Sequence, residues 1–61
     1  MSEWFVKYLD LHTNRETESH RVDARDQAII LALDRERNHC AIRSIVGPSG
    51  EEQWAQVKPK T

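Results

Sequence analysis

Apolar residues recur along the 61-residue chain with a period of two in some segments and with a helical period in one. The first apolar segment, residues 3–11 (EWFVKYLDL), is rich in aromatic and β-branched residues and predicts a strand. Both of its alternating sets of side chains are mostly apolar. Because apolar side chains on both faces are typical of the middle of a sheet, we expect a central strand.

A polar turn and a second strand are predicted next. Residues 12–16 (HTNRE) suit a turn, in which Asn14 is the residue best able to adopt a left-handed backbone conformation. Residues 17–22 (TESHRV) alternate but contain little apolar surface, which is typical of an exposed strand. Their charges discourage pairing with other chains, so we expect this strand at an edge of the sheet.

The stretch QAIILALDRER lies in a segment, residues 24–38, that has the helical period. Asp23 is the expected N-cap, and Asp26 favours the positive end of the helix dipole. The core face is expected to combine alanines along its centre, which let the helix approach a sheet, with larger residues at its margins. These residues are Ala24, Ala28, Ala32, Ile29, Leu31 and Leu33.

Ile30 is expected to point away from this core face, about 160° from its centre by the 3.6-residue period. Asp26, Asp34 and Arg37 surround it at helical spacing. A single exposed apolar residue is common on protein surfaces, and it is also a candidate contact for a partner.

Two further strands are predicted after the helix, at residues 40–47 (CAIRSIVG) and 51–57 (EEQWAQV). The GPSG stretch between them suits a type I turn, with Pro48 and Ser49 at its centre. Residues 58–61 (KPKT) are expected to fray.

The order ββαββ predicts an α+β fold in one small domain over residues 1–57. A helix of this length returns the chain along the sheet, so the first strand can lie between the second and third and run antiparallel to both. We expect a four-stranded antiparallel sheet in the order 2-1-3-4 with one helix on one face. The sequence leaves open which side of the first strand the helix covers. The two alternating sets are Trp4, Val6, Tyr8 and Phe5, Lys7, Leu9, Leu11.

Composition narrows the possible functions. Nine Lys and Arg against ten Asp and Glu give a net charge of -1, which does not favour strong non-specific attraction to nucleic acid or an anionic membrane. The chain start lacks the features of a secretory signal, and no segment approaches the roughly 20 apolar residues that span a bilayer. Cys40 has no disulfide partner in the chain and fits a reducing compartment, so a cytoplasmic protein is expected.

His12, His20, His39 and Cys40 are the candidate metal ligands, but their spacing matches no metal motif. His12 and His20 could approach across the first hairpin, whereas His39 and Cys40, adjacent in an extended chain, would point to opposite sides. No glycine-rich phosphate loop and no nucleophile motif is present. We therefore expect no catalytic residue, no cofactor, no metal and no small-molecule substrate.

The expected function is non-enzymatic protein binding, as an adaptor or inhibitor that uses the open sheet face and self-associates as a homodimer or binds another protein. Aromatic residues and arginine are enriched at the centres of interfaces. The candidate partner-binding residues are Trp4, Tyr8, Ile30, Arg37 and Trp54.

The alternative function is nucleic-acid binding, in which arginines contact phosphates and sheet aromatics stack on bases. Acidic residues interleaved with these arginines weaken that alternative.

In architecture alone, a ββαββ chain of this length resembles small accessory and inhibitor proteins of phages and mobile elements, including some anti-CRISPR proteins. The resemblance implies binding of another protein and assigns no residue to a site.

Overall fold

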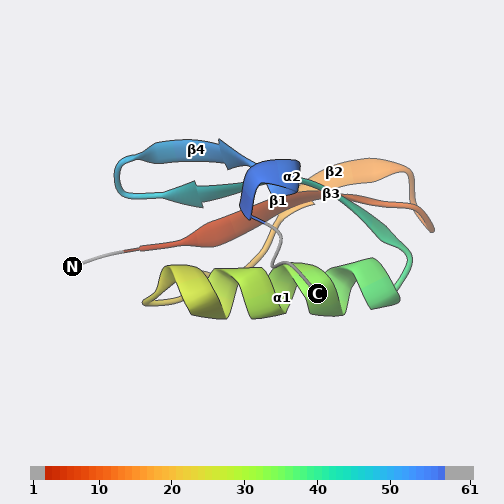
Figure 1. Cartoon of the computed structure of the whole chain (residues 1–61). Coiled ribbons are helices and arrows are strands. Elements are labelled where there is room, and N and C mark those ends of the chain that lie inside the picture. Colours follow the sequence, from red (N-terminus) through yellow and green to blue (C-terminus); the bar gives the residue numbers. More distant parts are fainter. Residues whose placement is uncertain (1–2, 58–61) are drawn as a thin grey trace.

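The computed structural model describes residues 3–57, except for the side chains of residues 56 and 57. It contains a four-stranded antiparallel sheet in the order β2-β1-β3-β4, with the long helix α1 packed on one face (Figure 1). The elements are β1 (Phe5–Asp10), β2 (Arg15–Glu18), α1 (Arg25–Arg37), β3 (Cys40–Gly47), β4 (Gly50–Gln53) and α2 (Trp54–Val57). The predicted α+β class and strand order are confirmed, while the predicted fraying of residues 58–61 lies outside the described residues.

β1 lies between β2 and β3, as its two apolar sets predict. Its even-numbered side chains face α1, because Val6 is fully buried and Trp4 and Tyr8 pack against the same core cluster. Since side chains alternate along a strand, the odd-numbered side chains of β1 point to the opposite face. The structure thereby resolves the choice that the sequence leaves open.

A β-bulge in β3 places two isoleucines that are three residues apart on the core face. The pairing of β1 with β3 shifts by one residue between Lys7 and Tyr8, which leaves Arg43 as the extra residue of β3. Strict alternation would put Ile42 and Ile45 on opposite faces of the sheet. With the bulge, both pack in the core cluster.

The core is small for a free-standing domain. Its fully buried hydrophobic side chains among residues 3–57 are Val6, Ala28, Ala32 and Ile45. Ala28 and Ala32 confirm the predicted line of alanines. Ala24, expected on the same line, is exposed because the helix begins only after it.

The N-terminus of α1 differs from the prediction. The helix begins at Arg25, so its N-cap is Ala24 and the prediction of Asp23 is wrong. The chain stays extended through Ala24 (φ -136°, ψ 152°), and no side chain caps the helix. The Asp23 backbone N–H instead donates to Gln27 Oε1 at 3.3 Å, while Asp26 lies in the first turn as expected.

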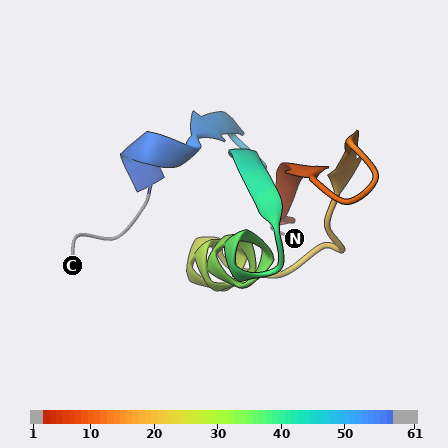
Figure 2. The ribbon, with the colours of Figure 1, turned by 90° about the vertical axis from the view of Figure 1, so that its right-hand side faces the viewer.

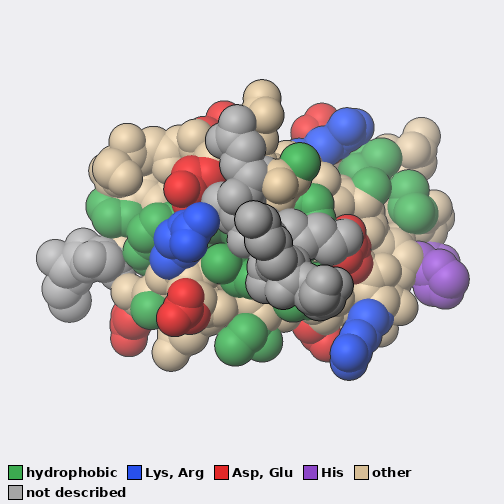
Figure 3. Space-filling view, viewed as in Figure 1, with side chains coloured by type: hydrophobic (Ala, Val, Ile, Leu, Met, Phe, Trp, Pro, Cys, Tyr) green, Lys and Arg blue, Asp and Glu red, His purple; other side chains and the backbone are tan. Residues whose placement is uncertain are grey.

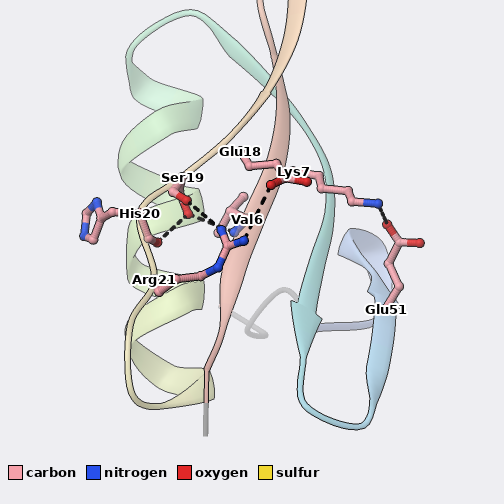
Figure 4. Close-up of polar contacts among 7 residues, drawn as sticks. All are labelled: Val6, Lys7, Glu18, Ser19, His20, Arg21 and Glu51. Atoms are coloured by element: carbon pink, nitrogen blue, oxygen red, sulfur yellow. Dashed lines mark hydrogen bonds and ion pairs between the residues drawn. The ribbon is translucent and has the colours of Figure 1, made fainter.

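β2 is shorter than predicted and starts two residues earlier. It ends at Glu18, because the next residue interrupts the ladder with its side chain. The Ser19 hydroxyl accepts a hydrogen bond from the Val6 N–H at 2.9 Å and donates to the His20 carbonyl at 3.0 Å (Figure 4). Val22, the predicted strand end, rejoins the sheet only through an isolated bridge.

β4 also ends early, and the residues predicted to continue it form α2. Gln53 of β4 pairs with Ser44 of β3. The residue before Ser44 is Arg43, the extra residue of the bulge, and regular pairing of β4 stops there. Trp54 packs against the core cluster instead, and its Nε1 donates to Glu36 Oε2 on α1 at 3.1 Å. This contact ties the end of the sheet to the helix.

The turns adopt conformations that suit their residues. Asn14 lies in the left-handed region at φ 57°, as predicted. Pro48 and Ser49 form the turn between β3 and β4, and Gly50 adopts φ 131°, which residues with a side chain rarely adopt. Within residues 3–57, no helix is long and apolar enough to cross a membrane.

Candidate functional site: the open face of the sheet

The sheet surface opposite α1 is the candidate functional site, because no second layer covers it within the described part of the chain (Figure 2). We call this surface the open face. β1 contributes Phe5, Lys7 and Leu9, and residues directly opposite one another in a sheet share a face. The partners on the other strands are Glu16, Glu18, Ala41, Ser44, Val46, Glu51 and Gln53.

A charged cluster occupies the middle of the open face. Lys7 Nζ lies 3.0 Å from Glu51 Oε2, and the Ser44 hydroxyl donates to the same oxygen at 2.7 Å; Figure 4 shows the ion pair. The hydrogen bond and the charge of Glu51, followed by the charges of Glu18 and Glu16, raise the pKa of Lys7 above its ordinary value. Hydrogen bonds from Ser44 and then from Lys7 lower the pKa of Glu51. Both charged forms are therefore favoured near neutral pH.

The charged cluster borders a shallow hollow of about 190 Å³, lined by Lys7, Glu16, Thr17 and Glu18. The cluster holds three glutamates, of which Glu51 is paired with Lys7 and Glu18 with Arg21, so three carboxylates against two cations leave one net negative charge. The Lys7 ammonium is already paired with Glu51. This side of the open face therefore favours a positively charged group of a partner over a phosphate.

Phe5 and Val46, which is paired with it on β3, are apolar residues at one end of the open face. The Arg21 guanidinium lies over its ring, 3.9 Å from the centroid, and Arg21 Nη2 lies 3.7 Å from Glu18 Oε1. Figure 4 shows Arg21 reaching back beside β1, where its Nη1 also donates to the Ser19 carbonyl at 3.4 Å. The phenylalanine ring is thus partly shielded by a cation.

The other end of the open face is less shielded. Leu9 and Ala41 are paired across β1 and β3, and both are half-buried. The Leu11 N–H donates to the His39 carbonyl at 3.0 Å, which extends the ladder, and the Leu11 side chain is 55% exposed. In Figure 3, hydrophobic side chains gather at the end of the molecule from which a histidine projects. An apolar contact area therefore lies next to the charged cluster.

The structure does not bring the five predicted partner-binding residues together. Trp4, Tyr8 and Trp54 pack against the core on the α1 side, so their side chains are not on the open face. Ile30, which is 67% exposed as expected, and Arg37 lie on α1, away from the core. A binding role for these five residues stays a prediction.

Sequence reasoning missed the charged cluster around Lys7. It placed Glu16 in a turn and Glu18 in an edge strand, and it used both as acids that weaken nucleic-acid binding. Their position beside Lys7, and that of Glu51 on its other side, follow from the pairing register of three strands. The predicted strand order was the available signal, because it placed the second and third strands on either side of the first.

The histidines also lie differently from the prediction. His12 packs edge-to-face against His39, with ring centroids 5.3 Å apart, rather than against His20. Burial raises the pKa of the Cys40 thiol, which favours its neutral and unreactive form. No group of three or more His, Cys, Asp or Glu side chains in residues 3–57 is arranged to hold a metal ion.

The charged cluster gives a pH-dependent prediction. The folded-state pKa of Glu51 lies below its ordinary value of 4.5, so its contacts stabilise the fold above that value and lose their effect as the pH falls through the folded-state pKa. Ser44→Ala should raise the pKa of Glu51 in a carbon NMR titration, because it removes the first of two hydrogen bonds. Ser49→Ala, in the exposed turn, should leave it unchanged. Equal titration midpoints in wild type and Ser44→Ala would contradict the hydrogen bond.

Comparisons of the chain with protein-family models, with curated proteins and with solved structures found no match.

Proposed function

We propose that the protein is a non-enzymatic interaction module, of the adaptor or inhibitor kind, that binds another protein through the open face. The observation that carries the proposal is a sheet surface without a second layer in residues 3–57, where apolar side chains adjoin a charged cluster. Interfaces of protein complexes combine apolar contacts with charged and polar groups, and the open face offers both, with apolar side chains at its two ends and the charged cluster between them. The shallow hollow is smaller than the usual small-molecule pocket, which supports a protein ligand over a small substrate.

The charges of the open face indicate the chemistry of the partner. Glu16 lines the hollow beside Lys7, and the Lys7 ammonium is paired with Glu51. A partner that presents Lys or Arg next to apolar side chains complements this surface. Such complementarity raises the association rate and the specificity of binding.

A second copy of the chain is a poorer occupant of the β2 edge. When a two-fold axis pairs β2 with the same strand of a second copy, even-numbered residues face even-numbered residues, and odd-numbered residues face odd-numbered ones. Glu16 then faces Glu16 or Glu18 of the second copy, and like charges directly opposite are destabilising. Self-pairing along the β2 edge is therefore unfavourable, and we propose a different protein as the occupant of the open face.

Nucleic acid is also a poorer occupant of the open face. Lys7 is paired with Glu51, and the Arg21 guanidinium lies between Phe5 and Glu18. The adjacent carboxylates repel phosphates. Binding of oligonucleotides with a steep salt dependence would contradict the proposal.

Leu9→Lys tests the open face, and Ile30→Lys is the matched control on the outer surface of α1. Leu9 is half-buried, and Ile30 is 67% exposed, so both variants should fold, which circular dichroism checks. We expect immobilised wild type and Ile30→Lys to retain the same protein from a host extract. The affinity of the purified target for Leu9→Lys should fall by about tenfold or more, because the lysine removes an apolar contact and its ammonium competes with the partner's cation for Glu16, which lies directly opposite position 9.

Each other outcome contradicts the proposal in a different way. Equal affinity for wild type and Leu9→Lys would exclude the open face. Loss of affinity in Ile30→Lys alone would assign binding to the surface of α1. A dimer seen by light scattering that Leu9→Lys dissociates would make a second copy the occupant.

A further inference from the structure

Two turns bring His12 and His39 together at one end of the sheet. Figure 1 shows the β1–β2 turn and the α1–β3 turn at the same end of the molecule. The two imidazole centroids are 5.3 Å apart, and the ring planes are nearly perpendicular at 80°. Both residues are exposed. An ion from solution can therefore reach the pair.

The separation of the two rings matches that of two histidines bound to one metal ion. A Zn–N bond of about 2.0–2.1 Å places each ring centroid roughly 3.2 Å from the metal. A tetrahedral angle between two such bonds separates the centroids by about 5.2 Å. Ring rotation, rather than movement of the backbone, is then needed to direct one nitrogen from each ring at a shared ion.

Backbone hydrogen bonds hold both turns in place. The Leu11 N–H donates to the His39 carbonyl at 3.0 Å, which joins the two histidine-bearing turns directly. The His12 N–H donates to Asp10 Oδ1 at 2.9 Å. His39 is held at φ 61°, in the left-handed region that costs energy for a residue with a side chain. A left-handed residue just after the C-cap is a common way to end a helix, and here it fixes the direction in which the chain leaves α1.

We propose that His12 and His39 bind one divalent transition-metal ion of the Zn²⁺ class, through one ring nitrogen each. Imidazole is a preferred ligand of these ions. Residues 3–57 place no third protein ligand of the usual kinds in the site, so water completes the coordination. This leaves the affinity below that of a structural zinc site with four protein ligands. The site is separate from the open-face charged cluster and does not depend on the function proposed for it.

Calorimetric titration of the full chain with zinc chloride tests the proposal, and NMR spectra locate the ion. We expect one equivalent to bind and to shift the ring signals of His12 and His39. His12→Ala and His39→Asn should each weaken binding by about tenfold or more. Asparagine is chosen for position 39 because it tolerates the left-handed conformation, so the variant should fold. His20→Ala is the matched control, since His20 is also exposed and is not part of the pair.

Three results would overturn the metal site. The first is the absence of saturable zinc binding by the wild type. The second is unchanged affinity in His12→Ala or in His39→Asn. The third is an equal loss in His20→Ala or a loss in Cys40→Ser alone, which would assign the ion to other ligands.

Discussion

Ile45→Ala should lower the free energy of unfolding by about 2–5 kcal/mol, because it removes a large side chain from a packed core and leaves a cavity. Among the side chains that the structure describes, Ile45 and Val6 are the largest that are fully buried. Ile30→Ala makes the same chemical change at a side chain that is 67% exposed, and it should alter the free energy of unfolding by less than about 0.5 kcal/mol.

Urea denaturation followed by tryptophan fluorescence measures the change in the free energy of unfolding for each variant that is folded in buffer. A domain of this length is marginally stable, so Ile45→Ala is expected to be largely unfolded in buffer. Ile45→Val then provides the graded test, with an expected loss of about 0.5–1.5 kcal/mol. A loss in Ile30→Ala as large as that in Ile45→Ala would show that the helical phase described above is wrong.

Gly47→Ala should destabilise the protein by about 1–3 kcal/mol, the usual cost of overpacking. A Cβ atom at Gly47 would lie 2.6 Å from Cζ3 of Trp4 and 2.7 Å from Cη2. The indole packs against the core cluster. Both the N–H and the carbonyl of Trp4 are hydrogen-bonded to the backbone of Val22, so the ring has little room to move. A loss of stability would itself support the clash, because replacing glycine by alanine at an unstrained position usually stabilises a protein.

A double-mutant cycle with Trp4→Leu identifies the cause of the loss. Because the clash needs both the new methyl group and the indole, Gly47→Ala should cost less in the Trp4→Leu background than in the wild type. Denaturant titration of the four proteins gives the coupling energy. Equal costs in the two backgrounds would show that the indole does not lie against Gly47.

The elements with strong local patterns were predictable from the sequence. β1 follows from apolar residues in both alternating sets, and its central position explains why both sets are present. α1 follows from the helical period, and the buried Ala28 and the exposed Ile30 lie on the sides that this period assigns to them. The strand order follows because these two elements leave few ways to connect the chain.

The ends of β2 and β4 were not predictable, because side-chain contacts made only in the folded protein decide them. The Ser19 hydroxyl takes the Val6 N–H and ends β2, although residues 17–22 alternate as a strand does. The bulge at Arg43 stops the pairing of β4, and Trp54 turns toward Glu36 on α1. Apolar residues three apart in β3, Ile42 and Ile45, were the one local sign of the bulge.

The open face was predicted as a surface but not residue by residue. Sequence alternation defines two sets of side chains on β1 without stating which set α1 covers. The covered set is fixed by long-range packing, in which Val6 and Ile45 meet Ala28 and Ala32. The charged cluster depends in addition on strand register, which no short stretch of sequence encodes.

Methyl relaxation by a soluble paramagnetic probe is the most direct test of the central claim, that the odd-numbered side of β1 is free of cover. In the protein without a partner, the methyl groups of Leu9, Leu11 and Val46 should be relaxed strongly, while those of Val6 and Ile45 should be protected. Protection of Leu9 and Val46 equal to that of Ile45 would contradict the claim, because a layer of protein would then cover the open face.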